Sequence, residues 1–335
     1  MKKYFPTFLT KAGEFVALGR LPVAVKINVV PVLEVLPGAA AKTEQFLLKE
    51  WTFGGNQVCI DASEYGHFDR SLRLLFNSLL SKGVNVIPVI QQNSDARYVA
   101  FVQSLIVTFG CKICIRTSNT SGGFQNYPAT INSLMGAVGS VRSNTLLLID
   151  LGYVEVNNYN LFGSLAVMLI NSLMHLQEWS EIIVSSSSFP ENLSHLKPSN
   201  RLYPLPRLEW DIWNIVSSAL GKRVKYGDYG TKYPFFSDTA FPGSSSIKYT
   251  TAGEYLIYRG DRAQDHADGN GQYITFAGRL ITHPDYSGVG FSWGDDEIYR
   301  IAHEVMANPK KRPGSPTTWV QISQNHHITL LDSLL

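Results

Sequence analysis

Short apolar runs recur along the chain, and each of them ends on a polar or charged residue. They fall at 29–34, 58–61, 84–91, 111–116, 146–150, 181–185 and 224–228. Amphipathic segments lie between most of the runs, for example with Leu72, Leu75, Phe76 and Leu79 at helical spacing. Parallel strands that are buried on both faces have near-continuous apolar sequences. The alternation therefore predicts an α/β fold, a TIM-like (β/α)8 barrel with loop insertions and a C-terminal extension.

The first and the last strand of this barrel are marked least clearly. The pattern places the first strand at 28–36, after a lead-in segment, and the eighth at 246–250. A segment at 254–259 is expected to pair with the eighth strand. We expect a single barrel domain over 1–335, in which an extension at 308–335 packs on the barrel.

Charge and cysteine content narrow the classes of function. The chain has 29 Lys and Arg against 27 Asp and Glu, a net charge of +2, which argues against a protein that coats a polyanion. The three cysteines are an odd number without framework spacing, which argues against a disulfide scaffold and favours a reducing compartment. Cys111 and Cys114 lie three apart on a predicted strand and so point to opposite faces, which argues against a zinc or redox pair. The N-terminus lacks a signal-peptide pattern, so we expect a soluble cytoplasmic protein without a membrane partner.

The polar residues that end the apolar runs are the first candidates for a site. The carboxyl ends of the strands of a parallel barrel meet around one opening. The residues at these ends are Glu34, Asp61, Gln91, Arg116, Asp150, Ser185 and Asp228. The four acids among them are expected to be catalytic, with two carboxylates of different pKa acting as acid and base. An alternative stays open, in which these residues form a buried ion-pair network that closes the barrel top.

Binding roles can be assigned to several residues on chemical grounds. Arg116 is a candidate substrate-binding residue, because arginine recognises phosphate or carboxylate with two N–H groups. Asp61 and Asp150 are candidate ligands for Mg²⁺ or Mn²⁺, since such ions bind carboxylate oxygens and commonly share their shell with phosphate. Near the presumed last strand, Lys248 and Arg259 are further candidate substrate-binding cations.

His326 is a candidate base or metal ligand near the end of the chain. It is followed by His327, and adjacent residues of a strand point to opposite faces, so at most one of the two would face the site. The alternative is a terminal segment that packs under the barrel. The sequence has no P-loop, no G-x-G-x-x-G after a strand, no H-E-x-x-H and no G-x-S-x-G.

A series of short motifs resembles the phage-type beta protein family. In chain order they include Lys11-Ala12-Gly13-Glu14, Val30-Pro31-Val32-Leu33-Glu34, Leu148-Ile149-Asp150-Leu151-Gly152, Tyr226-Gly227-Asp228-Tyr229-Gly230, Trp293-Gly294-Asp295 and His326-His327. The resemblance spans nearly the whole chain. It implies an α/β barrel that occurs in phages and in mobile or defence-associated bacterial loci, and it assigns no reaction and no catalytic residue.

Two hypotheses about function follow. In the first, an enzyme-like barrel acts on or binds a phosphate-bearing ligand, a nucleotide or nucleic acid, because acids lie beside Arg116. In the second, the chain is a non-catalytic recognition protein in phage–host conflict, with a protein partner encoded nearby. Its motivation is the lack of a catalytic signature together with long polar loops at 117–126 and 286–296. The residues leave open whether the protein is an enzyme.

Overall fold

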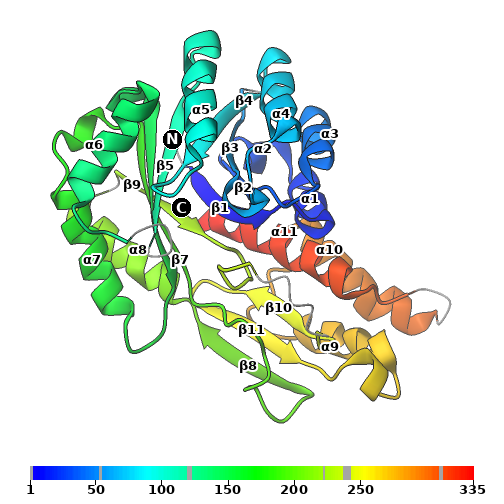
Figure 1. Ribbon diagram of the computed structural model, residues 1–335. Helices are drawn as coiled ribbons and strands as arrows, with labels where there is room; N and C mark the ends of the chain where they lie inside the picture. Colours follow the sequence, from blue (N-terminus) through cyan, green and yellow to red (C-terminus); the bar gives the residue numbers. More distant parts are fainter. Residues whose placement is uncertain (1–2, 53–54, 119–122, 222, 237–242, 309–311) are drawn as a thin grey trace. The chain divides into compact units, whose positions relative to one another are not determined.

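A computed structural model describes the chain except for residues 1–2, 53–54, 119–122, 222, 237–242 and 309–311 (Figure 1). Positions 119–122 of the predicted polar loop and 309–311 of the predicted extension thus lie outside the described residues. The chain divides into two compact units. The barrel unit comprises Met1–Thr10, Ile27–Ser188 and Leu208–Tyr229, and the sheet unit comprises Lys11–Lys26, Phe189–Arg207 and Gly230–Leu335. This division differs from the expected single domain with an extension at 308–335, because the sheet unit draws on three separate segments.

Parallel strands form a closed ring in the barrel unit. In order around the ring they are β1 (Tyr4–Leu9), β2 (Val32–Glu34), β3 (Gln57–Asp61), β4 (Asn85–Ile90), β5 (Ile113–Ser118), β6 (Thr145–Tyr153), β7 (Glu181–Ser187) and β9 (Val224–Asp228). The ring closes where β9 pairs in parallel with β1, with Phe5 opposite Gly227. The predicted α/β barrel is confirmed.

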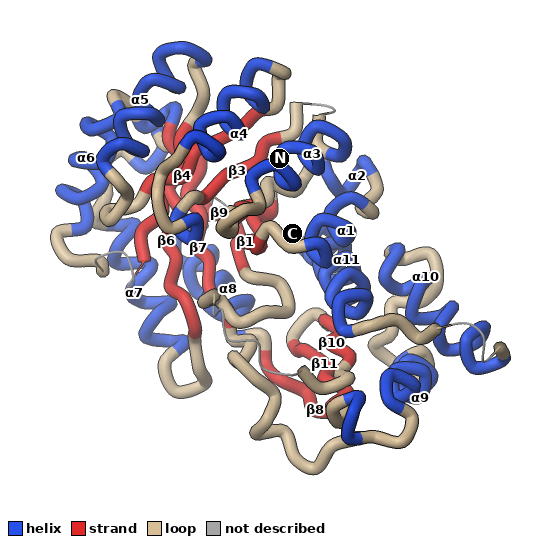
Figure 2. Tube along the Cα trace, turned by 45° about the vertical axis from the view of Figure 1, so that its right-hand side comes forward, coloured by secondary structure: helices blue, strands red, loops and turns tan. Residues whose placement is uncertain are grey.

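Helices cover the outside of this ring (Figure 2). They are α3 (Ala40–Glu50), α4 (Arg70–Ser81), α5 (Ala96–Phe109), α6 (Tyr127–Val138), α7 (Tyr159–Asn171) and α8 (Leu208–Leu220). The apolar residues of α4 that were predicted to share one face are buried. Its first turn is capped by Asp69, whose side chain accepts a hydrogen bond from the Leu72 backbone N–H. The helix α5 ends at Gly110, which has the left-handed conformation that favours glycine.

Alternate strand residues fill the interior of the barrel. The buried apolar cluster there consists of Phe5, Val30, Val32, Cys59, Ile87, Val89, Cys114, Leu146, Leu148 and Ile183. Successive side chains of a strand point to opposite faces. The residue two positions after each of these core residues therefore also points inward, which brings the polar strand ends to the top of the core.

The first and eighth barrel strands were placed wrongly from the sequence. The first is β1 at Tyr4–Leu9, inside the supposed lead-in segment, and the predicted strand at 28–36 contains β2. The segment predicted as strand eight is β10 (Ile247–Thr250), which belongs to a separate antiparallel sheet. Its predicted pairing with the next segment, β11 (Glu254–Arg259), is confirmed.

The sheet unit is built on this antiparallel sheet, in the order β10, β11 and β8 (Arg201–Pro206). Its helices are α1 (Ala12–Gly19), α2 (Val23–Lys26), α9 (Gln272–Leu280), α10 (Trp293–Arg300) and α11 (Pro316–Leu334). The strand expected around His326 is in fact the long helix α11, which begins with a capping box at Ser315. Within the described part of the chain, no helix combines the length and apolar character needed to cross a membrane.

The helices α10 and α11 approach each other closely at Gly294. A Cβ atom there would lie 2.5 Å from the Ile322 carbonyl oxygen and 3.2 Å from the His326 backbone nitrogen. We expect Gly294→Ala to lower the free energy of unfolding by about 1–3 kcal/mol, as overpacking does, in chemical denaturation. The matched control is Gly278→Ala in α9, where a Cβ would meet nothing within 4 Å, and no loss is expected there. An equal loss of unfolding free energy in both variants would contradict the close approach of α10 and α11 at Gly294.

Candidate functional site

The guanidinium of Arg116 lies at the centre of an ion-pair network at the C-terminal end of the barrel. Its Nη1 donates to Glu34 Oε1 at 2.8 Å and to Asp61 Oδ2 at 2.7 Å. Its Nε and Nη2 donate to Asp150 Oδ2 at 3.0 and 2.8 Å, and Nη2 also donates to the Tyr229 hydroxyl at 2.7 Å. Arginine has five N–H groups, and these five bonds engage all of them. Arg116 therefore holds protein groups rather than offering donors to a ligand.

Backbone and amide donors fix two of the carboxylates further. Asp61 accepts from the Ser63 backbone N–H at 2.9 Å and from Gln91 Nε2 at 3.2 Å. Asp150 accepts from the Gly152 backbone N–H at 3.0 Å and from the Tyr229 hydroxyl at 2.6 Å. Several donors thus hold these two aspartates in place.

Glu34 accepts fewer hydrogen bonds than the two aspartates. Arg116 donates to only one of its oxygens, and among the described residues no hydrogen-bond donor reaches the other. Burial raises the pKa of Glu34 to about 7; Arg116 opposes the shift, and the charges of Asp61 and Glu64 add to it. Near neutral pH the Glu34 carboxyl group is therefore present in both its protonated and its ionised form. It lies beside the Asp61 carboxylate, which also accepts from Arg116 Nη1.

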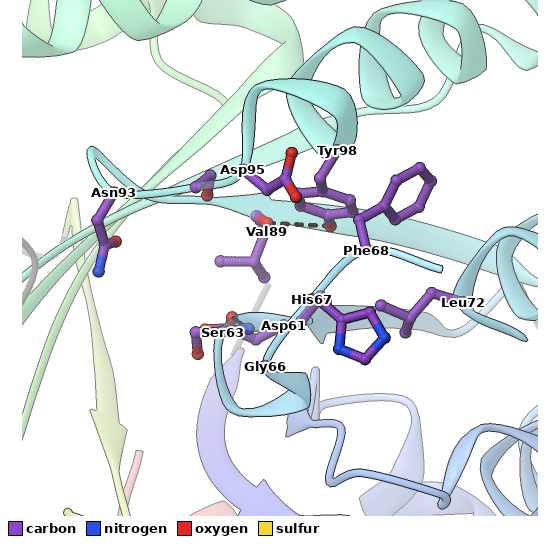
Figure 3. A pocket seen from close by; sticks show the side chains of 12 residues that line it. Asp61, Ser63, Gly66, His67, Phe68, Leu72, Val89, Asn93, Asp95 and Tyr98 are labelled. Atoms are coloured by element: carbon purple, nitrogen blue, oxygen red, sulfur yellow. Dashed lines mark hydrogen bonds between the residues drawn. The ribbon is translucent and has the colours of Figure 1, made fainter. Parts of the chain in front are cut away.

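A small pocket lies next to Asp61 (Figure 3). Its volume is about 180 Å³, and it is lined by the loops that follow β3 and β4, among them Ser63, His67, Asn93 and Asp95. In Figure 3, Ser63 and His67 lie on one side of it and Asn93 and Asp95 on the other. A volume of this size has room for several water molecules. The pocket therefore fits a small molecule or one end of a larger one.

The structure brings Glu34, Asp61, Arg116 and Asp150 together as predicted, but it places Asp228 on the outer face of β9. A Cβ on the preceding residue, Gly227, would meet Ser185 and Ile183 inside the barrel, so Asp228 points outward. The Asp228 carboxylate accepts a hydrogen bond from the Tyr4 hydroxyl. The inward position belongs to Tyr229, which the sequence reading missed.

The other three predicted residues, Lys248, Arg259 and His326, belong to the sheet unit. His326 is fully buried, with Nδ1 2.9 Å from Asp295 Oδ2 and Nε2 2.8 Å from the Thr250 carbonyl oxygen. Both ring nitrogens of His326 are therefore engaged by groups of the sheet unit, and His326 does not join the residues at the barrel end. Arg259 Nε donates to the Leu193 carbonyl at 3.1 Å.

The predicted metal site does not fit the residues present. Asp61 and Asp150 both bind the Arg116 guanidinium, which supplies the positive charge that a metal ion would bring. Over the described ranges of the chain, no group of three or more His, Cys, Asp or Glu residues is arranged to hold a metal ion.

Comparisons with known proteins place the chain in a family. No curated protein matches it. Among solved structures, triosephosphate isomerase from Bartonella henselae is similar, with 11% sequence identity, 68% of this chain and 92% of that chain covered, and a TM-score of 0.37. The barrel is established by its own strand pairing. The family model described as Beta protein matches residues 4–331. The chain therefore belongs to the Beta protein family, which the order of its motifs had indicated.

Proposed function

We propose that the C-terminal end of the barrel is an active site in which Glu34 transfers a proton to or from a bound ligand. The observation that supports this most directly is that Glu34 is buried and shares Arg116 Nη1 with Asp61; burial raises its pKa to about 7. An acid–base group works best when its pKa lies near the working pH. Paired carboxylates whose environments separate their pKa values are the usual arrangement for such chemistry, and this end of a barrel is where its active sites lie.

The charge of the network indicates the class of ligand. Three acidic side chains surround one guanidinium, so the network contains more acidic than basic groups. Such a site favours a neutral polar or a cationic ligand. The earlier hypothesis of a phosphate-bearing ligand, nucleotide or nucleic acid depended on Arg116. Because all N–H groups of that side chain are engaged by protein groups, Arg116 does not support a phosphate ligand.

A role in phage–host conflict is the second part of the proposal. It rests on membership of the Beta protein family and on the resemblance to phage-type members. The alternative function, a non-catalytic recognition protein with a partner encoded nearby, would be favoured if a neighbouring gene product copurified with the wild-type chain while no ligand was converted.

The proposed chemistry can be tested without knowing the ligand. The wild-type protein is incubated with a small-molecule extract of bacterial cells, and all changes in the extract are recorded by mass spectrometry. We expect a wild-type-dependent conversion that Glu34→Gln reduces at least a hundredfold, as loss of a general acid–base does. The matched control is Glu178→Gln, because the Glu178 side chain is 48% exposed. Conversion by Glu34→Gln at the wild-type rate would refute the role of Glu34.

A further inference from the structure

The pocket beside Asp61 has a buried apolar floor (Figure 3). The floor is formed by Phe68, Leu72 and Val89, which are at most 8% exposed. The Tyr98 hydroxyl also lines the pocket, but it donates to the Val89 carbonyl oxygen at 3.1 Å and is therefore already used. The floor can thus take up the apolar surface of a ligand, as ligand pockets commonly do.

The rim of the pocket is polar and exposed. It is formed by Ser63, His67 and Asn93. Within the part of the chain that the structure describes, no group hydrogen-bonds to the Ser63 hydroxyl, to either His67 ring nitrogen or to the Asn93 side-chain amide. An amide can both donate and accept, so the rim can bind polar groups that a ligand carries next to its apolar surface.

The two acidic side chains that line the pocket are each paired with an arginine. Asp61 binds Arg116 Nη1 at 2.7 Å, and Asp95 binds Arg97 Nη2 at 2.9 Å. No lysine or arginine is among the described residues that line the pocket. The pocket thus offers no spare anion to a cationic ligand and no cation to an anionic one. A charged ligand would lose hydration without gaining a partner, so an uncharged ligand is favoured.

The size of the pocket limits the ligand to about one ring. A cavity of about 150 Å³ holds one benzene molecule, and this pocket has a volume of about 180 Å³. We propose that the pocket binds an uncharged polar ring compound, with its ring on the apolar floor and its polar groups on the rim. As the ligand site of a reaction it rests on the function proposed above, because Asp61 and Glu34 share Arg116 Nη1.

Benzamide, benzoate and benzylammonium test this class of ligand, since they share one ring and differ in charge. Carbon–proton NMR spectra of the histidine rings of the full chain are recorded at rising concentrations of each probe, and His67→Gln assigns the His67 signal. We expect benzamide to shift this signal saturably, at lower concentrations than either charged probe, and to leave the exposed His195 unchanged. No saturable shift with benzamide, or tighter binding of a charged probe, would overturn the proposal.

Ser63→Phe fills the pocket from its rim. The Ser63 side chain is exposed, and its backbone N–H keeps the bond to Asp61 without the hydroxyl group, so the variant should fold. We expect it to lose the shift that benzamide causes. The matched control is Ser218→Phe on the exposed face of α8, which should keep the shift. Binding of benzamide to Ser63→Phe with the affinity of the wild type would overturn the pocket as its site.

Asn93→Leu tests the polar rim separately. We expect it to weaken benzamide binding about fivefold, as the loss of one hydrogen bond does. Asn157→Leu is the matched control, because Asn157 is also exposed and lies outside the pocket. An equal affinity in both variants would contradict the contact between the ligand and Asn93.

Glu34→Gln distinguishes the pocket from the proposed reaction. This variant should bind benzamide as the wild type does, although it is expected to lose the conversion of the ligand. If benzamide does not bind while Glu34→Gln still loses the conversion, the pocket alone is overturned. If benzamide binds and Glu34→Gln converts the ligand at the wild-type rate, the proposed function of Glu34 alone is overturned.

Discussion

Replacement of Arg116 by methionine is expected to lower the free energy of unfolding by about 3–5 kcal/mol at neutral pH, the usual loss when one partner of a buried ion pair is removed. Glu34, Asp61 and Asp150 all bind this one guanidinium. Without it, three carboxylates would share a buried site with no counter-ion. Urea denaturation of the wild type and the variant measures the difference.

The matched control is Arg97→Met. Arg97 also pairs with an aspartate, Asp95, but its side chain is 72% exposed, and such surface pairs contribute little. The loss in Arg116→Met should become smaller as the pH falls, because protonation removes the repulsion between the carboxylates. A loss no larger than that of Arg97→Met would contradict the central position of Arg116.

The second large effect is a gain in stability from Glu34→Gln, of about 3 kcal/mol above pH 7. Burial raises the pKa of Glu34 from 4.5 to about 7 in the folded protein. Between these values the folded state keeps a proton that the unfolded state has released. Wild-type stability therefore falls as the pH rises through this window, and the loss is complete above pH 7. Glutamine stays neutral, still accepts from Arg116 through its amide oxygen, and avoids this loss.

Stability measured as a function of pH tests this prediction. We expect the wild-type and Glu34→Gln curves to coincide near the lower end of the window and to separate as the pH rises. Glu178→Gln should follow the wild type. Parallel curves for the wild type and Glu34→Gln would show that Glu34 has an ordinary pKa. A variant that is more stable but inactive would be the trade-off expected at a catalytic site.

Much of the site could be predicted because the inward-facing positions of its strands are occupied by apolar core residues. Arg116 and the three carboxylates that it binds each follow an apolar core residue by two positions. These core residues are Val32, Cys59, Cys114 and Leu148. The end of an apolar run and the alternation of side chains then agree on which residue reaches the opening.

The strand β9 has no apolar core residue at its inward-facing positions. Its inward positions are Lys225, Gly227 and then Tyr229, and none of them belongs to the apolar core of the barrel. The sequence therefore offered no means to choose between Asp228 and Tyr229. Only the pairing of β9 with β1 and β7, which are distant in the chain, settles which side chain points inward.

The helix α11 was missed for a related reason. Five consecutive residues, 323–327, are buried although all are polar, so this part of the helix shows no apolar face. Their hydrogen bonds to other segments replace that pattern, as in the bond from Asn325 to the Ala17 carbonyl at 3.0 Å. Such partners cannot be inferred from spacing within one segment.

The central claim is that burial makes one glutamate at the barrel opening change its protonation near neutral pH, although Arg116 opposes this shift. Carbon-13 NMR of glutamate side-chain carboxyl groups, recorded over a pH titration, measures this directly. We predict one resonance that titrates near 7 and disappears in Glu34→Gln. Titration of every glutamate near its ordinary value would contradict the account.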